Sequence, residues 1–325
     1  MLPRGATRYY SLGRWALVDA LRAGDVGAGD RVLVPELICR EVLASVRTVG
    51  ATPIFYRVAP DLSADIGVPA APSAKAVLAV NYFGFPQCLD VFRDYCSRTG
   101  ATLIEDNAHG FLSRDATGRL LGSRGDAGIF SFRKTIAVPD GAAVVLNGHR
   151  RLPDGSSSRP ARDISVRYRA KQAFRRVAPY LGPCWTDRTI GLLRHLRRLG
   201  TGSALPASPT DAESRIPIAP HPNTWISRTM HVADPDLEAQ RRRALHALAA
   251  RVVAGTGAVP VFASLPPYVV PYGYPVFVPP AHLSEVVRET SRHGFQLSRW
   301  PDLPEAVVPS APDHYRQLMV LPFLW

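Results

Sequence analysis

The sequence predicts an α/β protein, with a large domain built on a mainly parallel sheet and a smaller C-terminal α/β domain. Apolar segments of helical and strand period alternate along the first 150 residues, which is typical of a parallel sheet covered by helices. A stretch dense in Pro, Ser and Ala, 202–222, then precedes a second, shorter alternation. We therefore expect a large domain over residues 1–220 and a small domain over 221–325.

The individual elements follow from the apolar periodicity and from the turn residues between them. Residues 15–22 have helical spacing, and the apolar run 32–34 has the length of a buried strand. In the large domain, the same criteria predict helices at 41–49 and 89–99 and strands at 53–56, 76–80, 102–105, 127–132 and 142–146. In the small domain, they predict helices at 236–253 and 282–293 and strands at 274–278 and 317–322.

Composition argues against several classes of protein. The net charge is +12, but the arginines are spread along the chain without a zinc-finger or RNP-like motif, so acidic small molecules are better partners than nucleic acid. The densest basic segment, 162–198, is interpreted as a solvated helical face. No run of 18 apolar residues occurs and residues 1–10 do not resemble a secretion signal, which indicates a cytoplasmic protein without a membrane span.

The four cysteines do not indicate a metal site. They lack paired ligand spacing and the density of a disulfide scaffold, so we interpret them as buried or incidental thiols: Cys39, Cys88, Cys96 and Cys184.

The strand predicted at 102–105 leads directly into polar residues. Glu105 and Asp106 are followed by small residues and His109. In a parallel sheet the carboxyl ends of the strands face the ligand crevice, so Asp106 is expected to point at a ligand. A carboxylate there could keep a pyridinium nitrogen protonated, and His109 could lie against that ring or hold Asp106. The alternative is that Glu105 and Asp106 cap a following helix.

Lys134 stands out because lysine is rare in this chain. Lysine occurs only at positions 75, 134 and 171, among 39 Lys and Arg residues. Arginine cannot replace lysine in Schiff-base chemistry, whereas a buried lysine beside another cation can become neutral and nucleophilic. Arg133 and the apolar context 130–132 favour such a lysine, on a tight connection between two strands. For Lys75 and Lys171, a solvated surface position is expected.

A phosphate-binding turn is predicted at the start of the first helix. Ser11, Gly13 and Arg14 lie where free N–H groups and the helix dipole attract an anion, although capping by Ser11 explains the same residues. Ser131 is a second candidate phosphate ligand. The chain has no G-x-G-x-x-G that opens a helix after a strand, no P-loop and no G-x-S-x-G, so dinucleotide, nucleoside-triphosphate and serine-hydrolase functions lose their usual support.

These segments, in this order, resemble the DegT/DnrJ/StrS family of sugar aminotransferases, which have the aspartate-aminotransferase-like fold (fold type I). The resemblance spans most of the chain, with 150–222 unmatched. It rests on the helix start 11–17, the "GDRVLVP" strand, Asn81 to Gly84, the "EDNAH" element, "SFRK" with "PDGA", and short C-terminal motifs at 274–276 and 321–322.

The resemblance implies pyridoxal 5'-phosphate as the cofactor. Lys134 would bear it covalently, Asp106 would pair with its ring nitrogen, and His109 would take the position of the family's Gln or His. Ser131, Gly13 and Arg14 would bind its phosphate. The sequence departs from the family's pattern in three places. The step from Ser131 to Lys134 is shorter than in the family, Ala142 stands where a second glycine is expected, and Cys39 lies near the position of an aromatic residue that stacks on the ring.

The resemblance also implies the reaction and the partners. An amino donor such as glutamate would supply nitrogen to a keto-sugar nucleotide in polysaccharide or natural-product biosynthesis, and a second subunit would complete the site of a homodimer. Two alternatives stay open: a non-catalytic protein that binds the cofactor or a sugar nucleotide, and a pyridoxal-phosphate enzyme of another reaction type. Sugar dehydratases of the family have His in place of the lysine, so Lys134 disfavours that version.

Overall fold

The computed structural model describes residues 2–65, 72–136, 138, 140–148, 151–153, 209–222, 226 and 234–323. The chain forms two compact units. The first, Met1–Ala161 with Asp211–Trp325, contains every element given below. The second, Arg162–Thr210, lies outside the described residues apart from 209 and 210. The basic segment 162–198 and Cys184 therefore lie outside the described residues, and the interpretations given for them stay predictions.

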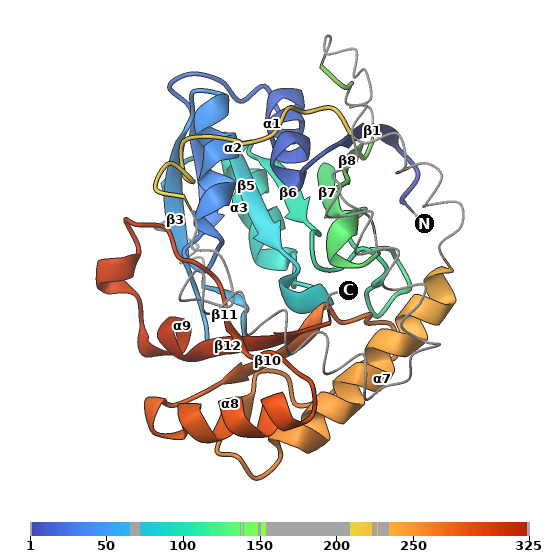
Figure 1. The fold of residues 1–325 in the computed structure, drawn as a ribbon. Coiled ribbons are helices and arrows are strands. Elements are labelled where there is room, and N and C mark those ends of the chain that lie inside the picture. Colours follow the sequence, from blue (N-terminus) through green and yellow to red (C-terminus); the bar gives the residue numbers. More distant parts are fainter. Residues whose placement is uncertain are drawn as a thin grey trace. The chain divides into compact units, whose positions relative to one another are not determined.

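An eight-stranded, mainly parallel sheet forms the first half of the chain (Figure 1). Its strands are β1 (Ala6–Tyr10), β2 (Arg31–Pro35), β3 (Thr52–Val58), β4 (Ala64–Asp65), β5 (Ala76–Val80), β6 (Thr102–Asp106), β7 (Ala127–Ser131) and β8 (Ala142–Leu146), in the order β1-β8-β7-β6-β5-β2-β3-β4. The central pairs from β3 to β7 are parallel, and β1, β4 and β8 are antiparallel to their neighbours. Every residue of β5, β6, β7 and β8 is buried, as expected for strands that are covered on both faces.

The helices of this half cover the sheet. They are α1 (Gly13–Ala23), η1 (Arg40–Val42), α2 (Leu43–Thr48), η2 (Tyr82–Gly84), α3 (Asp90–Thr99) and η3 (Phe132–Lys134). Helix α1 packs on β7, β8 and α2 through buried apolar residues such as Leu17 and Leu21, and α3 packs on β5 and β6. Helix α3 ends at Gly100, whose φ of 72° is the left-handed conformation that glycine accepts without strain.

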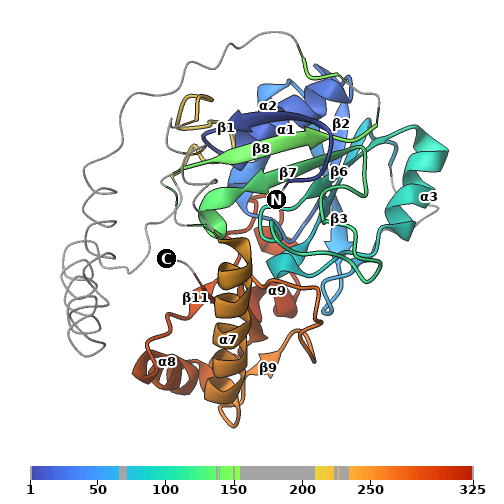
Figure 2. The same cartoon turned by 90° about the vertical axis from the view of Figure 1, so that its right-hand side faces the viewer.

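A four-stranded antiparallel sheet forms the last third of the chain (Figure 2). Its elements are α7 (Pro235–Val253), β9 (Val259–Pro260), β10 (Gly273–Phe277), η4 (Pro280–His282), α8 (Leu283–Arg292), β11 (Ser298–Arg299), η5 (Val308–Ser310), α9 (Asp313–Gln317) and β12 (Leu318–Pro322), with strand order β11-β12-β10-β9. Helix α7 begins with strong signals, because Asp234 accepts the N–H groups of Asp236 and Leu237 and Pro235 occupies the first turn.

The predicted α/β fold is confirmed, and all the expected helices and strands form within a few residues of their predicted bounds. The sequence analysis did not identify β1, β4, β9, β11 or α9. One apolar cluster joins the two sheets, with Leu318 and Val320 of β12 contributing to it, and a second cluster packs the other face of β10 and β12 against α7 and α8. The domain boundary near residue 220 stays a prediction.

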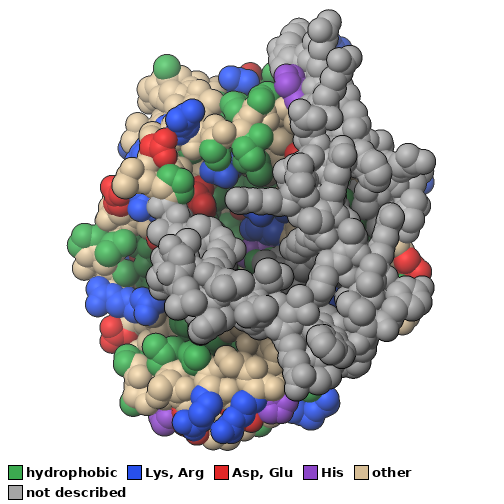
Figure 3. Space-filling model, viewed as in Figure 1, with side chains coloured by type: hydrophobic (Ala, Val, Ile, Leu, Met, Phe, Trp, Pro, Cys, Tyr) green, Lys and Arg blue, Asp and Glu red, His purple; other side chains and the backbone are tan. Residues whose placement is uncertain are grey.

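Basic side chains are scattered over the described part of the face in Figure 3, over the first helices as well as over α8. Within the described ranges, no helix has both the length and the apolar character needed to cross a membrane.

Candidate active site

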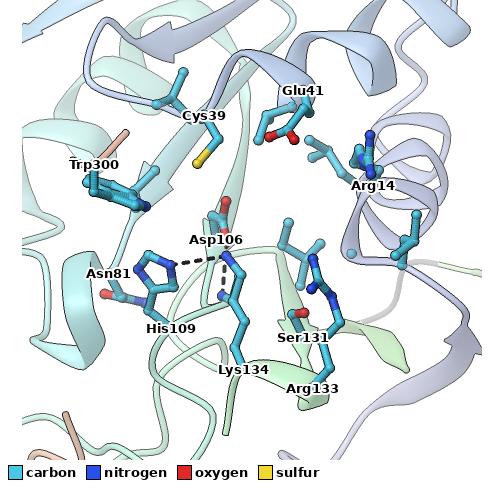
Figure 4. Close-up of a pocket in the computed structure, with 18 residues that line it drawn as sticks. Arg14, Cys39, Glu41, Asn81, Asp106, His109, Ser131, Arg133, Lys134 and Trp300 are labelled. Atoms are coloured by element: carbon cyan, nitrogen blue, oxygen red, sulfur yellow. Dashed lines mark hydrogen bonds between the residues drawn. The ribbon is translucent and has the colours of Figure 1, made fainter. Parts of the chain in front are cut away.

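One cavity lies at the carboxyl ends of the central parallel strands (Figure 4). Val80, Asp106 and Ser131, the last residues of β5, β6 and β7, all line it. Its empty volume is about 810 Å³, a value that includes open solvent at its mouth. The position agrees with the general rule that open α/β sheets bind ligands beyond their strand ends.

All six residues that the sequence analysis selected line this cavity: Gly13, Arg14, Asp106, His109, Ser131 and Lys134. They come from three separate segments of the chain: 13–14, 106–109 and 131–134. Arg14, Ser131 and Arg133 lie together on one side, and His109 lies on the other side with Trp300 (Figure 4). The turn η3 spans the short step from Ser131 to Lys134, so this departure from the family spacing still leaves both side chains at the cavity.

Asp106 is buried at the end of β6, and its Oδ1 accepts the N–H of Ala108 at 2.9 Å. Burial raises the pKa of this carboxyl, while the Lys134 charge and the Ala108 hydrogen bond act in the opposite direction. Residues 107–131 are all described, and no helix begins among them. The alternative that Asp106 caps a following helix is therefore wrong.

Glu105 has a different environment from its neighbour. It is fully buried and accepts hydrogen bonds from the N–H groups of Arg124 and Gly125. The Arg124 guanidinium forms a 2.8 Å ion pair with it and also donates to Asn81 Oδ1. Glu105 does not cap a helix either, and its satisfied hydrogen bonds indicate a structural role.

Lys134 occupies the turn η3 that connects β7 to β8, as predicted. Its side chain is half-buried, and Nζ lies 3.0 Å from Nε2 of His109. Burial lowers the pKa of Lys134 below its ordinary value, and the charge of Arg133 acts in the same direction. The carboxylates of Asp106 and Glu41 partly oppose this shift. The amine is thus more readily neutral than that of a solvated lysine.

The ring of His109 is held by aromatic stacking. Its centroid lies 4.1 Å from that of Tyr272, with 9° between the planes, and 5.6 Å from that of Phe83, with 19° between the planes. The N–H of Phe83 donates to Nδ1 at 3.4 Å. Burial lowers the pKa of His109 well below its ordinary value, and the positive charges of Lys134 and Arg242 add to this effect.

Arg242 in α7 supports the Lys134 turn, although it is remote in sequence. Its side chain is fully buried and pairs with Glu238 at 2.5 Å. It donates to the main-chain oxygens of Lys134 at 2.9 Å, Thr135 at 3.1 Å and Tyr272 at 3.3 Å. Sequence analysis missed it because the run of arginines at 241–243 has the pattern of a solvated helix face.

The predicted anion site combines a helix start with a hydroxyl group. Helix α1 begins after Leu12 without a side-chain cap, and the hydroxyl of Ser11 instead donates to the oxygen of Ala219 at 2.6 Å. The alternative that Ser11 caps this helix is therefore wrong. The position of a Cβ at Gly13 is 3.9 Å from that of Ser131, so the helix start and this serine are adjacent. Within the described part of the chain, the Ser131 side chain has no hydrogen-bond partner.

Cys39 and Trp300 line another part of the cavity (Figure 4). Burial raises the pKa of Cys39 to about 11, so its thiol is uncharged at neutral pH. Trp300 packs edge-on against Phe83, with 4.7 Å between the ring centroids, and it supplies an aromatic wall that Cys39 cannot. A single Trp in a C-terminal loop gives no sequence signal for this role, and the sequence analysis missed it.

The sheet order, with a lysine on the turn after β7 and an aspartate at the end of β6, defines the aspartate-aminotransferase-like fold, fold type I. Solved structures confirm the fold. DesV of S. venezuelae, solved with a ketimine intermediate, has a TM-score of 0.61 and 22% identity, and the match covers 97% of this chain and 79% of that one. Spr1654 of Streptococcus pneumoniae, solved in its PLP form, has a TM-score of 0.63 and 18% sequence identity. That match covers 98% of this chain and 82% of Spr1654.

Residues 11–152 match the model of the DegT/DnrJ/EryC1/StrS aminotransferase family, so the resemblance to this family is confirmed over that segment. A relative from Acidithiobacillus ferrooxidans, named UDP-N-acetyl-3-dehydro-alpha-D-glucosamine 3-aminotransferase, is 36% identical over 137 residues. This match covers 40% of the present chain and 37% of the relative, so the chain matches little more than a third of that relative's length.

Proposed function

We propose that this protein is a pyridoxal-phosphate-dependent aminotransferase that passes an amino group to a keto-sugar nucleotide. The observation that carries the proposal is the single cavity shared by Lys134, Asp106, Ser131 and the start of α1. A primary amine, a buried carboxylate and an anion site are the three features that this cofactor requires of a protein. The family match over residues 11–152 supports the same function.

The residues present fit the cofactor. Lys134, with its lowered pKa, is the amine that would hold it covalently. Asp106 is the carboxylate that would pair with the ring nitrogen. The start of α1 at Gly13 and Arg14, which has no side-chain cap, would bind the phosphate together with the hydroxyl of Ser131.

The chain's own residues would position the substrate and move protons. When bound, pyridoxal phosphate supplies an electron sink that stabilises negative charge on a substrate carbon. Asp106 favours the protonated ring nitrogen through its negative charge. Lys134 Nζ, once free of its covalent bond, can take a proton from one atom and return it to another, and His109 orients this amine at 3.0 Å.

The partners belong to the same proposal. The Acidithiobacillus ferrooxidans relative carries a nucleotide sugar in its name, and this supports an acceptor linked to a nucleotide diphosphate. Arg14 and Arg133 provide positive charge at the cavity for anionic groups. Glutamate is the proposed type of amino donor, in polysaccharide or natural-product biosynthesis. A cytoplasmic homodimer is the proposed state, and sedimentation at micromolar concentration tests the dimer.

One spectroscopic experiment tests this function. The purified protein, saturated with pyridoxal phosphate, should show a visible absorbance band that an amino donor discharges. Borohydride reduction and peptide mapping should then place the label on Lys134, and Lys134→Arg should remain unlabelled because a guanidinium cannot form the bond. A spectrum that no donor changes would favour a non-catalytic binding protein, and label on Lys75 or Lys171 would disprove the assignment.

A further inference from the structure

The backbone of Phe83 has an unusual conformation beside the active-site cavity. Its φ of 54° and ψ of 15° lie in the left-handed region, which non-glycine residues adopt rarely and at a cost in free energy. Gly84 follows with φ of 93°, and a Cβ there would lie 2.6 Å from the oxygen of Val270 and 3.2 Å from that of His109. Packing therefore fixes this turn in the one conformation that directs the Phe83 N–H at His109.

The direction of that N–H determines which nitrogen of His109 carries the proton. A backbone N–H can only donate, and it faces Nδ1 at 3.4 Å, so Nδ1 must offer its lone pair. In a neutral imidazole the proton then resides on Nε2. Nε2 lies 3.0 Å from Lys134 Nζ and is consequently a donor toward it.

A donor at Nε2 requires an acceptor at Lys134. An ammonium group has three donors and no lone pair, whereas a neutral amine can accept. A charged Lys134 would have to donate to Nε2, and this would put the His109 proton on Nδ1, against the N–H of Phe83. We propose that the cofactor-free protein holds Lys134 as a neutral amine, which accepts a hydrogen bond from His109 because the Phe83 N–H fixes the histidine tautomer.

The surroundings keep His109 in its neutral form. Burial is the largest influence and lowers the pKa of His109, since it penalises the charged ring. Arg242 lies close enough for its positive charge to disfavour an imidazolium as well. His109 thus remains a neutral donor, and it does not compete with Lys134 for a proton.

Charged groups from several elements face Lys134, and they act in both directions. Asp106 at the end of β6 and Glu41 in η1 favour the ammonium form, whereas Arg133 in η3 disfavours it. The Cys39 thiol is uncharged at neutral pH, because burial raises its pKa to about 11. Burial is the largest influence and lowers the pKa of Lys134. The His109 hydrogen bond adds to burial, since it stabilises only the neutral amine.

The inference deepens the proposed role of Lys134 as the residue that holds the cofactor. Only the neutral amine attacks a carbonyl carbon, so a lysine that is already neutral binds an aldehyde cofactor without first losing a proton. The tests use the cofactor-free full chain, and they remain valid even if the protein has no aminotransferase activity.

Nitrogen NMR of histidine-labelled protein reads the tautomer directly. At neutral pH, His109 should have a protonated Nε2 and a bare Nδ1, and the assignment comes from the signal lost in His109→Gln. A proton on Nδ1, or a doubly protonated ring, would overturn the proposal. The tautomer itself is read from the wild-type chain, and the variant serves only to assign the His109 signal.

Competitive amine labelling across a pH series measures the charge state of Lys134. The chain has only three lysines, and the exposed Lys75 gives an internal reference. A Lys134 that is neutral at about pH 7 should show half-maximal labelling below about pH 7, more than about three pH units below the ordinary value for lysine, and clearly below that of Lys75. Half-maximal labelling of Lys134 well above about pH 7 would contradict a neutral amine.

Variants of His109 give opposite results under the two arrangements. His109→Leu removes a donor to the neutral amine and should raise the half-labelling pH of Lys134 by about one unit. If Lys134 were instead a charged donor to His109, the same substitution would lower the half-labelling pH of Lys134. His109→Gln should preserve the wild-type value, because its amide oxygen can accept from Phe83 while its NH₂ donates to Lys134.

Discussion

The carboxylates of Glu105 and Asp106, neighbours at the end of β6, lie in separate environments. Glu105 forms an ion pair with Arg124 at 2.8 Å inside the protein, and Asp106 lines the cavity that contains Lys134. Successive side chains of a strand point to opposite faces, so the two acids cannot share one environment. Substitutions at the two positions should therefore have different consequences.

Asp106→Asn should fold and retain some pyridoxal phosphate but lose most of its reaction with an amino donor. Asn keeps the shape of the side chain and removes the charge that favours a protonated ring nitrogen. We expect the half-reaction to slow by about 100-fold or more, a loss typical of a main electrostatic stabiliser. Stopped-flow absorbance measures this rate. Asp106→Ala should also weaken cofactor binding, and an undiminished rate in Asp106→Asn would remove Asp106 from the chemistry.

Glu105→Ala should reduce stability, whereas Asp106→Asn should affect it much less. The substitution leaves the Arg124 guanidinium buried without its carboxylate, and breaking a buried pair costs about 3–5 kcal/mol. Urea denaturation of the cofactor-free protein measures the free energy of unfolding of each variant. Equal midpoints for Glu105→Ala and the wild type would show that the ion pair contributes little.

Ser131→Ala should weaken the binding of pyridoxal phosphate but leave the binding of pyridoxal nearly unchanged. The hydroxyl lies beside the start of α1, and only the phosphate can accept from it. A hydrogen bond to a charged group contributes about 1.5–3 kcal/mol, so the dissociation constant should rise roughly 10- to 100-fold. Titration of both ligands into both proteins gives the comparison. An equal loss for the two ligands would place Ser131 away from the phosphate.

His246 should make the protein less stable in mild acid. Burial, followed by the charge of Arg243, lowers the pKa of His246 from 6.5 to about 4. The unfolded chain therefore binds more protons between these values, and the free energy of unfolding contributed by His246 falls as the pH drops from about 6.5 to about 4.

His246→Phe should flatten this part of the stability profile. The ring packs edge-on against Tyr274 at 4.7 Å, a position that phenylalanine can fill without titrating. Thermal melts at pH 7 and pH 4.5 should show a smaller loss in the variant than in the wild type, and His282→Gln, at an exposed position, is the matched control. An identical loss in His246→Phe would mean that other groups control the acid response.

The elements of the sheet were predictable because local patterns encode them. Apolar runs such as 76–80 are short and bounded by turn signals, and Asp106 and Lys134 stand at strand ends where polar side chains are conspicuous. Strand β1 was missed because two of its five residues are exposed and only Tyr10 is buried, so that it resembles a polar N-terminus. The supporting residues Arg242, Tyr272 and Trp300 were missed for another reason, since their roles depend on contacts between distant segments that one sequence does not reveal.

Ala142 illustrates how a departure from a family pattern can be structurally neutral. It replaces an expected glycine, yet it lies fully buried within β8, paired with Tyr10 on one side and Ser131 on the other. The preceding Gly141 keeps the conformation that needs glycine, with φ of 130°. The pattern of glycines alone could not have distinguished the two positions.

The hydrogen bonds from Arg242 to the carbonyl groups of the lysine turn have a consequence for the order of synthesis. The arginine follows Lys134 by 108 residues, and all six residues predicted for the site emerge from the ribosome before it. A nascent chain that ends before α7 has all six side chains predicted for the site but lacks the Arg242 hydrogen bonds to the Lys134 turn. The amine at position 134 acquires its final setting only after α7 has been made and has docked, so most of the polypeptide must be translated before the site is complete.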